Sequence, residues 1–406
     1  MLIKKILKSY DYSLIAVYIF LCFFGLIMIY SASMVTAVEF YETSSDHFYK
    51  KQLFNIFVGL SAFLLAAVFP YKAFTRFKLP LKAVLFGTIG LLLAVHFVGV
   101  EVNGAQSWIN IGIMQIQPSE FAKLSVIIYL SAVYAKKQDY IDQLNVGVMP
   151  PLLIFGFICF LVFLEPDYGT AGIIFVIGCF VILCSGISFK MFFKLGALGA
   201  GLLVLVSPFI YLGRNYIFTN ERVGRIHAYL DPFQYAQGEG YQLVNSYLAI
   251  GAGGLQGLGL GQGIQKLGYL PESHTDFIMA IIVEELGLLG VAFVILGLSY
   301  IVLRGIYTGV KSRDPFGTML AVGISSMIGL QAFINLGGVS GVIPITGVPL
   351  PFVSYGGSSL LVLSLSMGVL VNVSMFVKYD EKYREKKEIS AANTSSEVKN
   401  VYNIHH

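Results

Sequence analysis

Apolar segments about 20 residues long recur along nearly the whole chain, and this feature limits the possible folds more than any other. A helix of about 20 residues crosses the ~30 Å hydrocarbon core of a bilayer. The chain is 56% hydrophobic and only 12% charged, whereas an average soluble domain is roughly a quarter charged. The sequence therefore predicts an all-α polytopic membrane protein and not a soluble domain.

Ten such segments are predicted to be transmembrane helices. The first is not a cleavable signal peptide, because its apolar stretch is too long and no A-x-A-like site follows it. An even number of spans places both termini on the same side of the membrane. The predicted spans cover residues 13–33, 53–69, 81–100, 118–135, 149–164, 168–187, 192–212, 276–303, 317–337 and 355–377.

The distribution of lysine and arginine predicts which side holds the termini. Most of the 27 lysines and arginines lie in the two termini and in the loops on their side of the membrane, and cytoplasmic loops carry an excess of these residues. Both termini are therefore expected to be cytoplasmic. The net charge of +4 follows from this asymmetry and does not indicate a nucleic-acid partner. We predict a membrane domain over residues 1–378 and a disordered cytoplasmic tail over residues 379–406, which are polar and charged.

The loop between the seventh and eighth predicted spans, about residues 213–275, is much longer than a simple connection. It contains many aromatic residues at helical spacing with cations among them, so we predict a folded extracellular cap of short amphipathic helices. Seven of the thirteen residues from Gly251 to Gly263 are glycine. A close-packed turn or a hinge explains them better than a phosphate-binding loop, because no strand precedes them and no Gly-Lys-Ser/Thr follows.

The sequence LPESHTDFI begins the eighth predicted span with three titratable residues, Glu272, His274 and Asp276. One interpretation is a helix cap. Ser273 and Asp276 have the spacing of a capping box, or Thr275 is the cap and Asp276 interacts with the helix dipole. The other interpretation is a functional cluster, because Glu272 and Asp276 would share a helical face if the helix began early. A cap needs one acid, so three titratable groups favour the functional cluster.

Further polar residues are predicted on the same side of the membrane. Trp108, the only tryptophan, is either an interface anchor or part of a site. Pro118 begins the fourth span at the favoured first helical position, and Glu120 and Lys123 follow it. These two are either an internal ion pair or functional groups, because ionisable residues inside spans face the bundle interior or a wet cavity. Asp167, in the turn EPDYG, is either a helix cap or a site residue.

Five blocks of the sequence resemble a known family. The blocks are GAQSWI, QPSEFAKL, EPDYGTAG, LPESHTDFI and, over residues 335–359, NLGGVSGVIPITGVPLPFVSYGGSS. In this order, and at these places in a ten-span topology, they are similar to the SEDS proteins (shape, elongation, division and sporulation). The resemblance covers about residues 10–378. Within the family, DYSLIAVYIFLCFFGLIMIYSAS and GVPLPFVSYGGSS are more similar to the cell-division members of Gram-positive bacteria than to the elongation members.

The resemblance implies a peptidoglycan glycosyltransferase that polymerises lipid II into undecaprenyl-linked glycan on the outer side of a bacterial plasma membrane. It also implies a class B penicillin-binding protein and other divisome proteins as partners, and enrichment at the division septum. The essential acid of the family falls on Asp276, its tryptophan on Trp108 and its lysine on Lys123.

The chemistry of such a reaction agrees with these residues. A sugar hydroxyl displaces a lipid-linked diphosphate, so one carboxylate within hydrogen-bond reach suffices as a general base. The leaving diphosphate requires preorganised cations, for which Arg222, Arg225, Lys123 and Lys266 are candidates. No cofactor is required by the sequence, although a divalent cation, magnesium or manganese, would assist. A single inverting displacement is what the family resemblance implies. Asp276 is the predicted catalytic residue, and the predicted substrate-binding residues are Trp108, Lys123, Glu120, Arg222, Arg225, His274, Glu272, Asp167 and Ser354.

Two other function classes remain open. One is a lipid II flippase, for which internal repeats and a site at the membrane midplane would be typical. The sequence has no internal repeat, and its charges gather at one face, although the segment GVIPITGVPLP is broken by proline and glycine. The other class is a noncatalytic scaffold for a penicillin-binding protein, which would not require the acidic cluster.

Overall fold

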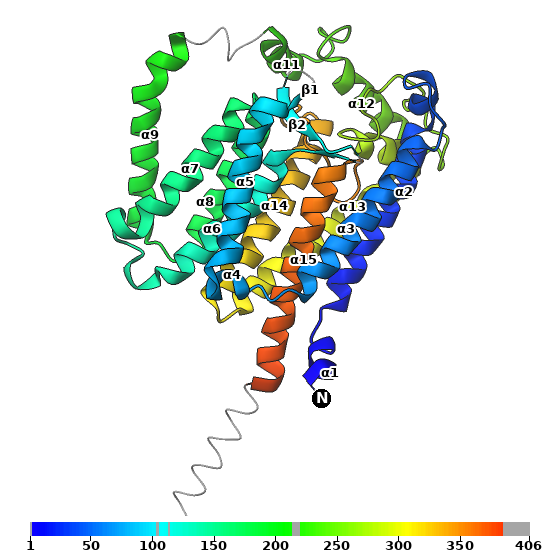
Figure 1. Ribbon diagram of the computed structural model, residues 1–406. Helices are drawn as coiled ribbons and strands as arrows, with labels where there is room; N and C mark the ends of the chain where they lie inside the picture. Colours follow the sequence, from blue (N-terminus) through cyan, green and yellow to red (C-terminus); the bar gives the residue numbers. More distant parts are fainter. Residues whose placement is uncertain (1, 103–104, 113, 213–219, 385–406) are drawn as a thin grey trace, which may run out of the picture.

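The computed structural model describes residues 2–102, 105–112, 114–212 and 220–384, which form a bundle of long helices (Figure 1). In these ranges, seven helices are long and apolar enough to cross a membrane, so the chain is a multi-pass membrane protein, as predicted. They are α2 (Tyr12–Glu39), α3 (His47–Val68), α5 (Lys78–Val98), α7 (Met149–Leu164, preceded by a π-helical turn, Leu144–Val148), α13 (Ile278–Lys311), α14 (Pro315–Val339) and α15 (Gly357–Tyr379).

Three more helices lie at the remaining predicted spans. They are α6 (Pro118–Lys136), α8 (Tyr168–Leu183) and α9 (Phe189–Leu212). Pro118 occupies the first turn of α6, where its missing N–H has no helical partner to lose. A helix therefore lies at each of the ten predicted positions.

The prediction of an all-α fold is wrong at one point, where a small antiparallel sheet joins α5 to α6. Its strands are β1 (Val100–Val102), β2 (Ala105–Asn110) and β3 (Gln115–Ile116), in the order β1-β2-β3. The sequence VEVNGAQSWIN contains an Asn-Gly pair between two short β-prone runs, which is a hairpin signal. The sheet places Trp108 opposite Val100.

The two ends of the bundle differ. The short helix α1 (Leu2–Leu7) and the end of α15 lie at one end, where α4 (Ala73–Arg76) also lies (Figure 1). The sheet lies at the opposite end with α11 (Asn220–Leu230) and α12 (Tyr241–Gly253), which belong to the predicted cap. Residues 213–219 of that cap lie outside the described residues, as do residues 385–406 of the predicted tail. Residues Asp380–Arg384, at the start of the predicted tail, are helical.

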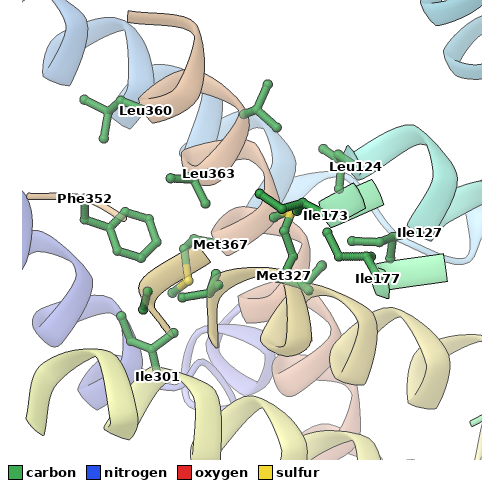
Figure 2. Close-up of a cluster of buried hydrophobic side chains, with 14 of the residues drawn as sticks. Leu124, Ile127, Ile173, Ile177, Ile301, Met327, Phe352, Leu360, Leu363 and Met367 are labelled. Carbon is green, nitrogen blue, oxygen red and sulfur yellow. The ribbon is translucent and has the colours of Figure 1, made fainter. Parts of the chain in front are cut away.

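Buried apolar side chains from α6, α8, α13, α14 and α15 fill the centre of the bundle (Figure 2). Helices come close here because small residues replace bulky ones, as is usual for membrane helices. A Cβ atom on Gly323 of α14 would lie 2.8 Å from a methyl carbon of Ile127 on α6, and one on Gly368 of α15 would lie 2.5 Å from the carbonyl oxygen of Phe63 on α3. The labelled core residues are Leu124, Ile127, Ile173, Ile177, Ile301, Met327, Phe352, Leu360, Leu363 and Met367.

Helix α13 is broken near its start. Gly287 has φ 58° and ψ −147°, which are not helical values. The break leaves the carbonyl groups just before Gly287 without helical donors. The loop after α12 supplies backbone N–H groups to these carbonyl groups. The backbone N–H groups of Leu258 and Gly259 donate to the carbonyl oxygens of Glu284 and Glu285, both at 2.9 Å. The glycine-rich segment is therefore packed into the broken helix.

Candidate active site

Asp276 lies in a turn before α13 and not inside the helix. The helix begins at Ile278, its N-cap is Phe277, and no side chain makes a capping hydrogen bond. The capping box of Ser273 with Asp276 and the cap by Thr275 are therefore both wrong. The Ser273 hydroxyl donates to the Ala32 carbonyl on α2 at 3.0 Å, and the Thr275 hydroxyl donates to the Glu272 carbonyl at 3.1 Å.

The early helix that would have aligned Glu272 with Asp276 is also absent from this part of the described chain. Glu272 has φ 54°, a left-handed backbone conformation that helices do not contain. The Asp276 carboxylate makes no hydrogen bond to any other described residue. Among the described residues, the carboxylate is therefore neither a helix cap nor hydrogen-bonded to a partner.

The backbone around Asp276 is held by two polar side chains from distant helices and loops. The Asn335 amide on α14 donates to the Asp276 carbonyl at 2.7 Å and to the Val348 carbonyl at 2.8 Å. The Ser354 hydroxyl donates to the Thr275 carbonyl at 2.6 Å. Ser354 therefore positions the loop that carries Asp276. Its geometry supports this positioning role for a residue that was predicted to bind substrate.

A small pocket with an empty volume of about 200 Å³ lies beside Asp276. Because this volume includes open solvent, the enclosed space is far smaller than a ligand pocket, and a large substrate requires movement of its walls. The pocket is lined by Asp276, Phe277, Ile334, Asn335, Gly338, Val339, Ile345, Thr346, Gly347 and Val348.

Gly347 is a wall residue close to the carboxylate. Its φ is 74°, and a Cβ atom there would lie 3.5 Å from Asp276 Oδ2. We expect Gly347→Ala to cost about 1–2 kcal/mol, because the left-handed conformation is strained for alanine, and to place a methyl group in van der Waals contact with the carboxylate. Thermal unfolding should report the loss of stability. Gly112→Ala is the matched control, since Gly112 also has positive φ but a Cβ atom there would meet nothing within 4 Å.

Burial raises the pKa of Asp276 to about 7. The nearby charge of Glu272 raises it further, while the charge of Arg225 lowers it. A carboxyl group with this pKa is a stronger base than an ordinary aspartate and is about half ionised at pH 7, so its pKa lies close to the operating pH, as suits a general base.

His274 is buried in an aromatic cluster. Its ring centroid lies 4.4 Å from that of Phe48 and 5.5 Å from that of Tyr355. Burial lowers the pKa of His274 to about 4, although Glu272 opposes this effect, so the ring is neutral at pH 7. The His274 carbonyl also accepts a hydrogen bond from the Tyr355 N–H at 2.9 Å. His274 thus holds the loop in place by packing, whereas Glu272 is exposed.

The cap helices approach the same pocket from outside the bundle. Arg225 on α11 and Ile345 line a neighbouring pocket with an empty volume of about 230 Å³, and Ile345 is shared by the two pockets. The Tyr229 hydroxyl donates to the Val342 carbonyl at 2.9 Å, and the Ser246 hydroxyl on α12 donates to the Val339 carbonyl at 2.8 Å. The arrangement brings Arg225 toward Asp276. The side chain of Arg222 lies outside the described residues.

Residues 12–379 match the FtsW/RodA/SpoVE family, described as cell cycle proteins. The chain belongs to this family. It is 54% identical over 389 residues to the probable peptidoglycan glycosyltransferase FtsW of Bacillus subtilis, covering 96% of each chain. It is 40% identical to stage V sporulation protein E of the same organism, covering 91% of this chain and 98% of that protein. These matches confirm the SEDS resemblance and its similarity to the cell-division members.

Solved structures agree with the family. A chain from a study titled "Structural coordination of polymerization and crosslinking by a peptidoglycan synthase complex" matches with a TM-score of 0.69 and 25% identity, covering 90% of this chain and 97% of that one. The crystal structure of the rod shape determining protein RodA of Thermus thermophilus matches with a TM-score of 0.63 and 23% identity, covering 90% and 96%. The second match supports the fold alone.

The other predicted site residues of this family member lie on neighbouring elements. Glu120 and Lys123 form an ion pair of 2.7 Å inside the bundle, with side-chain exposures of 5% and 2%. Trp108 is partly buried on β2, and this strand contacts α5 and α6.

The turn after α7 contains two different carboxylates. Asp167 caps α8 by accepting from the Thr170 N–H at 3.0 Å, as one interpretation predicted, and it also accepts from the Gln117 amide at 3.1 Å. Glu165 is buried without a hydrogen-bond partner among the described residues. Burial, and then the charge of Asp167, raise its pKa to about 8.

Lys266 is not available to a diphosphate, contrary to the prediction. It is 1% exposed and forms an ion pair of 2.5 Å with Glu285. Sequence reasoning also missed the roles of Asn335 and Gly347. Only their place in a segment rich in glycine and proline marked them, because their contacts reach residues far apart in the chain.

No group of three or more His, Cys, Asp or Glu side chains that would hold a metal ion is found within the described residues. A magnesium or manganese ion in this reaction would be held chiefly by the oxygens of the diphosphate substrate.

Proposed function

We propose that this protein is a peptidoglycan glycosyltransferase that polymerises lipid II into glycan strands for septal wall synthesis. The observation that carries the proposal is Asp276. Its carboxyl group has a raised pKa, makes no capping hydrogen bond and lines a pocket that shares Ile345 with the pocket of Arg225. The relative that is 54% identical carries the name of this activity, and the helices of the predicted cap, α11 and α12, lie at the end of the bundle opposite α1 (Figure 1).

In the proposed reaction, Asp276 removes the proton from a sugar hydroxyl while the hydroxyl oxygen attacks the anomeric carbon of a lipid-linked sugar. The bond between that carbon and the diphosphate oxygen breaks, and the diphosphate leaves with the electron pair. Attack from the opposite face converts an α-linked donor into a β-linked product. Arg225 stabilises the negative charge on the leaving group, with Arg222 on the same helix as a second candidate.

The topology and partners belong to the same proposal. Ten spans with both termini in the cytoplasm place Asp276 on the outer surface of a bacterial plasma membrane, where lipid II is polymerised. A class B penicillin-binding protein would cross-link the strands. The solved chain that matches this fold belongs to a peptidoglycan synthase complex that coordinates polymerization and crosslinking. Apolar contacts between membrane helices would hold such a partner, and we expect septal enrichment with other divisome proteins.

The test is direct. The purified protein, together with a class B partner that can only cross-link, is supplied with lipid II, and glycan polymer is measured. Polymer supports the glycosyltransferase. Translocation of lipid II across vesicles without polymer would favour a flippase, and neither activity would favour a scaffold.

The pH dependence follows from the raised pKa of Asp276. A general base acts only when it is deprotonated, so kcat/KM should rise about tenfold per pH unit below the pKa and become constant above it. With a pKa of about 7, the bend is expected near neutral pH. Initial polymerisation rates at subsaturating lipid II provide the profile. A bend near the ordinary aspartate value, about pH 4, would contradict the assignment.

A further inference from the structure

The glycine-rich loop after α12 is held by two buried glutamates of α13. Glu284 and Glu285 are 0% and 1% exposed, and both carboxylates face the loop instead of lipid. Glu284 accepts from the backbone N–H groups of Ile264 at 2.8 Å and Gln265 at 3.1 Å. Glu285 accepts from the N–H of Gly261 at 3.0 Å. Charged side chains at such depth are costly unless they have partners, and here the loop supplies the partners.

A lysine and a serine complete this network. The Lys266 ammonium donates to Glu285 Oε1 at 2.5 Å and to the Ser31 hydroxyl on α2 at 2.9 Å. The Ser31 hydroxyl in turn contacts the Glu285 carboxylate at 2.8 Å. An ion pair thus joins the loop to α13, and a hydrogen bond joins it to α2.

At Gly253, the last residue of α12, and at Gly257 in the loop, the packing against backbone leaves no room for a side chain. A Cβ atom on Gly257 would lie 2.4 Å from the Glu285 carbonyl oxygen, and one on Gly253 would lie 2.1 Å from the Val283 carbonyl oxygen. One on Gly263 would lie 2.8 Å from Glu284 Oε2. The glycines therefore serve a close-packed turn, which was one of the two interpretations of the sequence. They let the backbone reach the break in α13.

This network borders the segment that carries Asp276 on both sides. Lys266 lies ten residues before Asp276, and Glu284 lies eight residues after it. Between Lys266 and Asp276, the Ser273 hydroxyl is bonded to the carbonyl of Ala32, which is the neighbour of Ser31 on α2. The segment is consequently fixed to α2 and α13 close to the carboxylate.

We propose that Lys266, Glu284 and Glu285 are positioning residues that hold the Asp276 carboxylate in its catalytic orientation. The inference rests on the proposed function, because it assigns these residues to the same reaction. A displacement of about 1 Å in a catalytic group can lower a rate roughly 10²-fold. The network therefore acts on kcat, and affinity for lipid II is set elsewhere.

The test uses the full chain and a neutral pair, Lys266→Met with Glu285→Gln, which leaves no unpaired buried charge. We expect kcat for lipid II polymerisation to fall about tenfold or more, with KM changed less than about threefold. Amide hydrogen exchange over residues 254–277 should become faster. Glu284→Gln keeps one oxygen acceptor, so its kcat and its exchange should stay close to those of the native protein. Glu284→Met keeps no acceptor and should change both quantities as the neutral pair does.

Asp11→Asn is the matched control, because Asp11 is buried and paired with Arg304 at 2.8 Å at the opposite end of the bundle. It should lower the unfolding temperature without changing kcat or exchange over residues 254–277. An unchanged kcat in the neutral pair, or a lower kcat without faster exchange, would overturn the proposal. The proposal would also be overturned if Asp11→Asn and the neutral pair, at the same loss of stability, changed kcat and exchange over residues 254–277 equally. If the native protein makes no polymer, the proposed function fails, and unchanged exchange in the neutral pair would separately overturn the role of the network.

Discussion

Replacing Asp276 by asparagine is expected to lower lipid II polymerisation by roughly 10²- to 10⁴-fold without destabilising the protein. Asparagine preserves the shape of the side chain but does not accept the hydroxyl proton. No cap is lost, because Asp276 makes no capping hydrogen bond. The measurements are polymer yield from purified variants and their thermal unfolding.

The stability half of this prediction follows from the direction of the pKa shift. The pKa of Asp276 is raised in the folded protein, so the folded state binds its proton more tightly than the unfolded chain does. That contribution to stability is fully present at low pH and is lost as pH rises through the folded pKa of about 7. Asparagine has no charge to bury, so the variant should be at least as stable as the native protein above neutral pH.

Asp276→Glu separates charge from position. It restores a carboxylate, but the added methylene moves that carboxylate within a pocket bounded by Gly347, and we expect little recovery of activity. If Asp276→Asn kept near-native activity, Asp276 would not be the base, and the proposed mechanism would be wrong.

The sequence predicted the helices well because their signals are local. An apolar run of membrane length is visible without any tertiary contact, and the predicted start of α6 at Pro118 is the observed one. The sheet from β1 to β3 was missed because its strands are two to six residues long and lie between long apolar runs that dominate the pattern.

The site was only partly predictable, because its geometry depends on contacts between distant residues. Asp276 and Arg225 were identified from charge and from the family resemblance. The anchoring of Asp276 by Asn335 and the pairing of Lys266 with Glu285 join segments 59 and 19 residues apart. No local periodicity indicates such pairs. Lys266 was therefore predicted to bind diphosphate, when its charge is already neutralised inside the protein.

Lys123 provides the second large expected effect. Lys123→Met leaves the Glu120 carboxylate without its partner inside the bundle, where removal of one member of a buried ion pair costs about 3–5 kcal/mol. Glu120 Oε2 already lacks a hydrogen-bond partner among the described residues, so no local group replaces the ammonium. We expect a large fall in unfolding temperature and in the amount of folded protein recovered from membranes.

The double variant Glu120→Gln with Lys123→Met distinguishes a structural pair from a functional one. It removes both charges with little change of volume, and such neutral replacements are often tolerated, so we expect recovery of the unfolding temperature. If the pair serves the substrate, polymerisation per folded molecule stays at least tenfold below native, since the diphosphate lacks its preorganised cation. If activity returns together with stability, the pair only holds α6 in the bundle, and the cations for the leaving group must be sought on α11, where Arg225 lies near enough to lower the pKa of Asp276.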